Sequence, residues 1–283
     1  MMTADIHQGK PKYMNFRDRI GVDCSRTVAA EDAVAWAKTN DVTYIDCQID
    51  IAPNALESFD DARCGPIREA CADAGIHIGL HTLSAVNIAE VSPFLRDAAD
   101  EYLRAYIDAA AGLNAEWIEV HAGYHFTDDK DLRMAAGLER LKRATGYAEE
   151  KGVQLLLENL NWEPDLAEVH YLAHTVEECL YYFDAIQSPA LNWSFTINHA
   201  TLVPEGIAGF LDGMPTARLA EVRIADNNGE YEIHMFPGDG IIDFKDAFRR
   251  IEATGFTGHY MSSYGTMDDM LRGRDYLVNN CAP

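Results

Sequence analysis

Histidine and acidic side chains recur in this chain at the ends of short apolar segments. His81 and His121 each end such a segment, Glu158 follows one directly, and His199 comes three residues after another. A single histidine placed in this way is more often a hydrogen-bonded structural residue than a ligand, but chance explains repeated placement poorly. Imidazole and carboxylate groups together bind divalent cations, and either can transfer protons in catalysis. The pattern therefore predicts a site for metal binding or proton transfer.

Further polar residues accompany the later apolar segments. They are Trp162 after the fifth segment, Arg223 and Asp226 in and after the seventh, Glu232 and His234 in the loop beyond it, and Ser263 at the end of the eighth. The first two segments end near Asp23 and Asp46, to which we assign no role. Our candidate catalytic residues are Glu158, Arg223 and His199. Our candidate substrate-binding residues are Trp162, Ser263 and Asp226.

The apolar segments that carry these residues have the length and composition of buried β-strands. They cover residues 19–24, 42–48, 76–81, 116–121, 153–157, 190–196, 219–225 and 258–263. Amphipathic helical stretches separate them, near residues 29–39, 64–74, 97–112, 131–151, 175–186, 205–213, 243–254 and 267–279. Strict alternation of strand and helix predicts parallel strands joined by right-handed crossovers.

Eight repeats favour an α/β fold in which the sheet closes into a single-domain (β/α)₈ TIM barrel. The length of 283 residues suits one such barrel, since these domains run to about 250 residues or more. An open doubly wound sheet is the alternative, but no G-x-G-x-x-G motif follows the first strand. We assign residues 1–18 to a polar N-terminal extension and residues 19–283 to the barrel. Active sites of such barrels lie at the carboxyl ends of the strands, where our candidate residues are expected to converge.

The composition restricts the partners of this protein. The formal net charge is -23, from 46 acidic and 23 basic residues. Such a surface repels phosphate groups, which argues against nucleic acid and against anionic membranes as partners. The six cysteines contain no C-x-x-C pair, and the first 18 residues have no apolar signal segment. We therefore expect a cytoplasmic protein with reduced thiols that acts on a small-molecule substrate.

Five short motifs coincide with predicted strand ends. They are His81-Thr-Leu-Ser-Ala-Val-Asn87, Glu119-Val-His-Ala-Gly123, Leu157-Glu-Asn159, Asn198-His-Ala200, and Glu232-Ile-His234 followed by Gly238-Asp-Gly240 and Asp243. With these motifs, nearly the whole chain resembles the xylose isomerase-like barrel superfamily. That group includes sugar isomerases and epimerases, inosose dehydratases and the metal-dependent endonuclease of abasic-site repair. Barrels of this group often pair, so a homodimer is one expectation.

The resemblance implies a divalent metal, but the ligand set departs from the usual one. Family isomerases and epimerases usually hold one ion with a glutamate, an aspartate, a histidine and a glutamate from the fifth to eighth strands. Glu158 keeps the first place, whereas Thr196, Arg223 and Ser263 occupy the other three. A guanidinium cannot ligate a metal and adds positive charge. We therefore expect this four-residue site to be lost.

The additional ligands of the multi-metal members are retained. His81, His121 and Glu158 match one metal position, and His199, Glu232 and His234 match another. The first set is a His₂Glu group of the kind that binds catalytic zinc with one position open. Three alternatives follow, which are a zinc or manganese ion at the first position, an ion at the second, or no metal.

The resemblance also implies proton transfer next to a carbonyl group, as in an isomerase or epimerase acting on a small sugar or keto acid. Ser263 in place of the last carboxylate argues against a symmetric two-carboxylate reaction, so we expect Glu158 or a histidine to act as a single base. Arg223 then binds a substrate carboxylate or an enolate oxygen, or forms a salt bridge with Asp226 or Glu158. The alternatives are a lyase or dehydratase, with aromatic substrates included, and a barrel that only binds a ligand. The net charge disfavours an abasic-site endonuclease.

Overall fold

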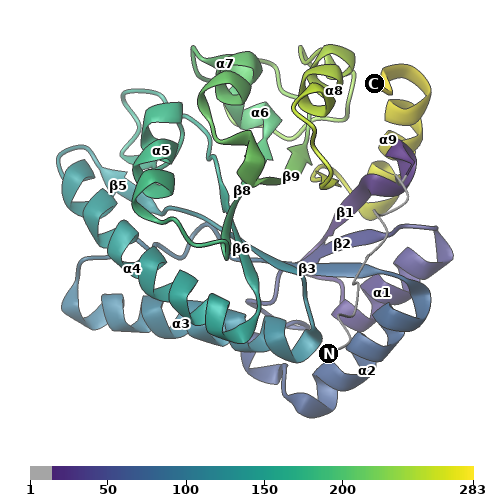
Figure 1. Ribbon diagram of the computed structural model, residues 1–283, viewed down its shortest axis with the longest axis horizontal. Helices are drawn as coiled ribbons and strands as arrows, with labels where there is room; N and C mark the ends of the chain where they lie inside the picture. The colour runs from purple at the N-terminus through teal and green to yellow at the C-terminus, as the bar shows by residue number, and fades with distance from the viewer. Residues whose placement is uncertain (1–14) are drawn as a thin grey trace, which may run out of the picture.

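The computed structural model describes residues 15–283, which form a closed barrel of eight parallel strands with the helices on its outside (Figure 1). The strands are β1 (Ile20–Cys24), β2 (Tyr44–Cys47), β3 (His77–His81), β4 (Trp117–Val120), β6 (Gln154–Glu158), β8 (Leu191–Thr196), β9 (Leu219–Ile224) and β10 (His259–Ser262). Their order around the barrel is β1-β10-β9-β8-β6-β4-β3-β2. This confirms the predicted fold class and each of the eight predicted strands.

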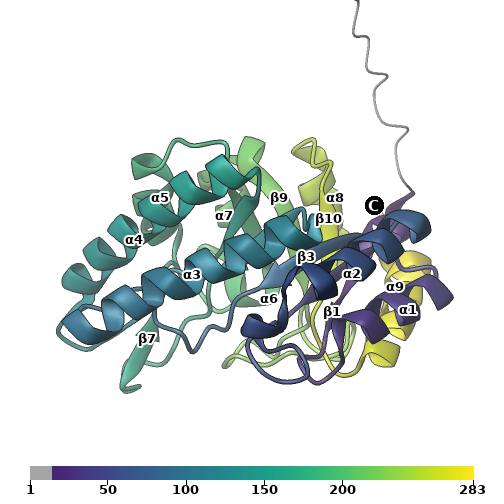
Figure 2. The ribbon, with the colours of Figure 1, turned by 90° about the horizontal axis from the view of Figure 1, so that it is seen from below.

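The eight predicted helices are also present. They are α1 (Ala30–Thr39), α2 (Asp61–Ala74), α3 (Pro93–Leu113), α4 (Lys130–Lys151), α5 (Val176–Ala185), α7 (Gly206–Gly213), α8 (Phe244–Ala253) and α9 (Met267–Cys281). The long helices α3 and α4 pack side by side on the outside of the barrel (Figure 2). None of the helices in residues 15–283 combines the length and apolar character needed to span a membrane.

Local sequence signals fix several helix ends. The Asp60 side chain accepts a hydrogen bond from the backbone N–H of Arg63 and so caps the first turn of α2. Gly75 ends that helix with a φ of 65°, a left-handed conformation that glycine adopts without steric cost. Thr266 and Asp269 form a reciprocal capping box at the start of α9. Such signals explain why the predicted helix boundaries lie close to the observed ones.

Several short elements escaped prediction. Strands β5 (Tyr124–Phe126) and β7 (Val169–Tyr171) pair antiparallel outside the barrel. The four-residue helix α6 (Ile197–Ala200) follows β8 directly, and three 3-10 turns are η1 (Phe16–Arg19), η2 (Leu56–Ser58) and η3 (Thr216–Arg218). These elements have only three or four residues each, too few for a hydrophobic period to be recognised.

Apolar and aromatic side chains fill the amino-terminal end of the barrel. Trp117, Leu156 and Met261 form a buried cluster inside it. Gly79 makes room for the indole, because a Cβ atom at this position would lie 1.9 Å from the Trp117 ring. Tyr44 stacks between two histidines, with its ring centroid 4.7 Å from that of His77 and 4.6 Å from that of His259. The candidate residues His81, His121 and Glu158 lie instead at or just beyond the carboxyl ends of their strands.

The predicted N-terminal extension over residues 1–18 lies mostly outside the described residues. Within the described part, Phe16 packs edge-on against Phe248 and Tyr260, with ring centroids 5.0 and 5.3 Å apart. This residue therefore belongs to the packed barrel. All six cysteines are free thiols, and five of them are buried.

Candidate active site

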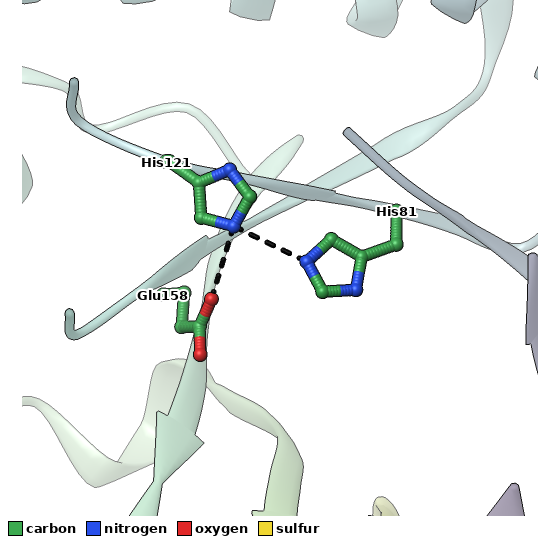
Figure 3. Close-up of side chains that lie close together, drawn as sticks. All are labelled: His81, His121 and Glu158. Atoms are coloured by element: carbon green, nitrogen blue, oxygen red, sulfur yellow. Dashed lines mark hydrogen bonds and ion pairs between the residues drawn. The ribbon is translucent and has the colours of Figure 1, made fainter. Parts of the chain in front are cut away.

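Three neighbouring strands bring His81, His121 and Glu158 together at the carboxyl end of the barrel (Figure 3). The Nε2 atoms of His81 and His121 are 3.2 Å apart, and His121 Nε2 is 3.1 Å from Glu158 Oε2. The other carboxylate oxygen of Glu158 accepts a hydrogen bond of 2.5 Å from the Thr196 hydroxyl. All three predicted ligands thus share one cluster, which we call the first histidine cluster.

The surroundings of the two histidines determine which nitrogen each presents to the cluster. Thr82 donates its hydroxyl proton to the Glu119 carbonyl, so its oxygen accepts from His121 Nδ1 at 3.3 Å. His81 Nδ1 lies 3.5 Å from Asp23 and 3.6 Å from Asp46, whose carboxylates favour a proton on that nitrogen.

His121 Nε2 lies 3.2 Å from His81 Nε2 and 3.1 Å from Glu158 Oε2. With both Nδ1 atoms protonated, three lone pairs would meet there, so the group requires a further proton or a cation among these atoms. The carboxylates of Asp23 and Asp46 raise the pKa of His81 despite the opposing effects of burial and Arg223. Burial lowers the pKa of His121. The cluster therefore suits either an imidazolium at His81 or a bound metal ion.

Glu158 is buried, yet its surroundings stabilise the charged form of its side chain. Burial alone would raise the pKa of the carboxyl group, but the hydrogen bond with His121 and the charge of His199 hold it well below its ordinary value. His199 Nδ1 lies 3.5 Å from Glu158 Oε1. Glu158 is therefore a buried carboxylate held in its ionised form, which is the state required of a base.

His199, Glu232 and His234 form a second histidine cluster. His199 comes from α6, and the other two come from the loop between β9 and α8. Both histidines direct Nε2 at Glu232 Oε1, at 3.1 Å from His199 and 2.6 Å from His234. Their Nδ1 atoms contact backbone carbonyl groups, those of Asn159 and Ser263 respectively. Against the effect of burial, the charge of Glu232 raises the pKa of His199 to about 9.

Arg223 lies at the centre of the barrel and is 2% exposed. Its guanidinium forms ion pairs with four carboxylates, at 2.5 Å with Asp23, 2.7 Å with Asp46, 3.1 Å with Glu221 and 3.6 Å with Glu119. The expected salt bridge is therefore present, but the predicted partners Asp226 and Glu158 were wrong. Side chains of a strand point alternately into and out of the barrel, and this alternation on β1, β2 and β4 could have identified three of the actual partners.

The carboxylate of Asp226 is fully buried and accepts hydrogen bonds from backbone N–H groups of the loop that follows it. The four donors, at 2.8 to 3.1 Å, are Asn227, Gly238, Gly240 and Ile242. This geometry assigns Asp226 to holding the loop that carries Glu232 and His234. It gives no support to the prediction that Asp226 contacts substrate.

The other two candidate binding residues lie nearer the surface. The Ser263 hydroxyl is 3.4 Å from Asp23 and 3.3 Å from His234 Nδ1. Trp162 is half-buried and packs against the hydrophobic core. Asp23, to which the sequence analysis gave no role, is therefore in contact with Ser263, Arg223 and His81.

Comparison with known proteins places this chain in a family. The sequence model of the xylose isomerase-like TIM barrel family matches residues 34–275, and the chain belongs to that family. An uncharacterized protein of Methanocaldococcus jannaschii is 24% identical over 208 residues, which cover 71% of this chain and 69% of the relative.

Solved structures share the fold along nearly the full barrel. A D-tagatose 3-epimerase-like protein has a TM-score of 0.80 at 22% identity, covering 92% of this chain and 96% of that one. D-psicose 3-epimerase from Clostridium cellulolyticum H10 has a TM-score of 0.75 at 14% identity, covering 92% and 97%. The 3-keto-D-glucoside 4-epimerase of E. coli has a TM-score of 0.73 at 15% identity, covering 93% and 99%.

Proposed function

We propose that this protein is an isomerase or epimerase that moves a proton next to the carbonyl group of a small hydroxylated sugar or keto acid. The observation that carries the proposal is the ionised, buried Glu158 beside two histidines at the mouth of the barrel. The fold supports it, because several structures with the same fold are described as sugar epimerases. A buried base held next to proton donors suits removal of a weakly acidic C–H proton.

The contacts of each site residue indicate its role in this reaction. Glu158 takes the proton from carbon, and the positively charged His199 beside it stabilises the negative oxygen that develops. Arg223 is paired with four carboxylates and is a positioning residue, because its charge holds those groups in place. The Ser263 hydroxyl and the Trp162 ring provide contacts for hydroxyl groups and for a sugar ring face.

The residues present fit a divalent metal in the two histidine clusters but not in the central four-residue position. There the guanidinium of Arg223 replaces a ligand and repels a cation. In each cluster three ligand atoms lie within 4.8 Å of one another. We propose that His81, His121 and Glu158 hold a zinc or manganese ion, with His199, Glu232 and His234 as a second position. Such an ion polarises a substrate carbonyl oxygen.

A lyase or dehydratase is the second candidate. The observation that favours it is Ser263, which places a hydroxyl where the family's last strand usually supplies a carboxylate. A site with one base removes a proton and expels water from the neighbouring carbon more readily than it inverts a stereocentre. The two reactions give different products from the same ketose, so one experiment separates them.

The test is incubation of the purified protein with D-tagatose, D-psicose and D-fructose in D₂O, followed by NMR. We expect deuterium at the carbon next to the carbonyl and appearance of the epimer. Glu158→Gln should reduce both by on the order of 10²-fold or more, whereas the exposed Glu168→Gln control should not. Loss of water without an epimer would assign the lyase, and ligand binding without either reaction would overturn the proposal.

A further inference from the structure

We propose that Arg26, in the loop between β1 and α1, binds a carboxylate group of the substrate, so that the protein acts on sugar acids in preference to neutral sugars. The inference rests on the proposed function and extends it, because it names the substrate class of the same site. Carboxylate binding was one predicted role of Arg223, and the contacts of the two arginines favour Arg26 instead.

Arg26 differs from the other arginines in its contacts. Every other arginine in residues 15–283 contacts a carboxylate, a backbone carbonyl group or an aromatic ring. Arg26 is exposed and makes no hydrogen bond, ion pair or ring contact with any residue that the structure describes. Acidic residues outnumber basic ones 46 to 23 in this chain, so a guanidinium without a carboxylate partner is exceptional. Its hydrogen-bond donors are therefore free to bind a ligand.

The charge of Arg223, by contrast, is already balanced by the protein. Four carboxylates surround its guanidinium, and its side chain is 2% exposed. A substrate carboxylate beside Arg223 would add a fifth negative charge to this group, and the four existing charges would repel it. Recognition of an anionic substrate therefore requires a different cation.

Arg26 lines a cavity of about 350 Å³ at the mouth of the barrel, together with Gln48, His234 and Ser263. This volume lies in the range of small-molecule pockets, about 300–1,000 Å³. The side-chain amide of Gln48 is half-buried and makes no hydrogen bond within the described part of the chain. The cavity therefore combines one unpaired positive charge with the amide of Gln48 and the hydroxyl of Ser263, which suit the hydroxyl groups of a sugar acid.

The same cavity adjoins the second histidine cluster. His234, which lines the cavity, contacts Glu232 Oε1, and that oxygen is 3.1 Å from His199. His199 in turn is 3.5 Å from Glu158. The proposed base therefore lies at the other end of these contacts from the cavity. An extended substrate that is held at Arg26 by one end would direct its other end toward the base.

A carboxylate matches Arg26 better than a phosphate group does. A guanidinium donates two parallel N–H bonds to the two oxygens of a carboxylate, and one positive charge then balances one negative charge. A phosphate monoester carries a charge of about −1.5 to −2 at pH 7. Asp23 lines the same cavity and Glu232 lies beside it, and these acids repel the larger negative charge more strongly. The site therefore favours a monoanionic sugar acid.

Binding of two unreactive molecules tests the assignment without catalysis. D-Gluconate and D-glucitol have the same carbon chain, but only D-gluconate ends in a carboxylate. In titration calorimetry we expect D-gluconate to bind more tightly by on the order of 10-fold or more. Arg26→Gln should remove this difference and leave the affinity for D-glucitol unchanged. Arg249→Gln, which replaces an exposed arginine of α8, is the control and should bind both molecules as the wild type does.

Kinetics with D-fructuronate, which is D-fructose with a terminal carboxylate, test the same contact during the reaction. Arg26→Gln should raise the KM for D-fructuronate by on the order of 10-fold and leave kcat within a few-fold of wild type, because Arg26 holds an end of the substrate that does not react. The KM for D-fructose should not change. Added salt should raise the KM for D-fructuronate alone, since ions screen an exposed charge.

Three results would overturn the assignment while the proposed function stands, provided that the wild type interconverts D-psicose and D-fructose. They are equal affinities of the wild type for D-gluconate and D-glucitol, unchanged binding of D-gluconate by Arg26→Gln, and tighter binding of D-glucitol 6-phosphate than of D-gluconate. A different result separates the two proposals in the other direction. Binding of D-gluconate that depends on Arg26, in a protein that converts neither D-fructuronate nor the ketoses, would support this binding site and overturn the proposed function.

Discussion

The guanidinium of Arg223 donates to the carboxylate of Asp46 across 2.7 Å, at a depth where neither side chain is more than 2% exposed. This pair connects the first histidine cluster to the core, because the same Asp46 oxygen lies 3.6 Å from His81. A charge at this position thus supports the site and the fold at the same time.

Arg223→Gln should therefore destabilise the protein as well as inactivate it. The substitution leaves buried carboxylates without a counter-ion, and such a change costs on the order of 3–5 kcal/mol. Chemical denaturation measures the loss. Arg250→Gln, which removes an exposed ion pair with Asp246, serves as the control and should leave the unfolding midpoint in place. An unchanged midpoint in Arg223→Gln would mean that the four carboxylates do not need its charge.

Elemental analysis of the purified protein should find about one zinc or manganese per chain. His121→Ala removes one ligand of the first histidine cluster and should release that metal. Replacing His170, which stacks on His125 in the β5–β7 pair, should leave the metal content unchanged. Protein prepared without chelator that carries no metal would assign the close contact between His81 and His121 to a shared proton.

A second buried carboxylate, that of Glu178, lies outside the barrel mouth and predicts a pH-dependent stability. Glu178 contacts Lys130 at 2.5 Å and His174 at 3.2 Å. Against the effect of burial, these partners hold the pKa of Glu178 at about 2. A carboxyl group with a lowered pKa stabilises the fold above its ordinary value of 4.5 and loses that contribution as the pH falls toward 2. The shift corresponds to about 3 kcal/mol.

Glu178→Gln should therefore be less stable than the wild type above pH 5, and the difference should shrink between pH 5 and pH 2. The pKa of His174 is raised, so its contribution to the free energy of unfolding is fully present below pH 6.5. That contribution is lost as the pH rises past the raised pKa. Urea denaturation at several pH values measures both effects. Glu177→Gln, an exposed neighbour on the same helix turn, is the control. A constant difference across the pH range would contradict the role assigned to Glu178.

Gly79→Ala should destabilise the barrel because its new methyl group would overlap the Trp117 indole. Overpacking of this kind costs about 1–3 kcal/mol. Gly146→Ala provides a matched comparison, since its Cβ meets nothing within 4 Å on the exposed side of α4. That change should stabilise the protein by about 0.5–1 kcal/mol. Thermal unfolding of both variants measures these two effects. Equal unfolding midpoints would contradict the close contact between Gly79 and the Trp117 ring.

The sequence was sufficient for the barrel because its signals are local and repeated. Each strand is a short apolar run, and residues such as Gly75 mark where a helix must stop. The same reasoning brought His81, His121 and Glu158 together, since neighbouring parallel strands end at the same edge. The short pairing of β5 with β7 has no such signal, because three-residue strands carry no period.

The partners of buried charges could not be predicted in the same way. Arg223 was expected near Asp226 or Glu158, but which acids surround a buried guanidinium depends on the inward register of several strands at once. Asp226 looked like a ligand-binding group because it follows a strand. Its carboxylate instead accepts hydrogen bonds from four backbone N–H groups. This arrangement depends on the path of a loop that no pattern in the sequence specifies.

Trp117, Leu156 and Met261 fill part of the barrel interior with apolar side chains, and Trp117 begins the strand that His121 follows. Under the proposed function, substrate and product would therefore both bind at the end of the barrel where the histidines lie. Product should then compete with substrate for the same residues and act as a competitive inhibitor of the forward reaction.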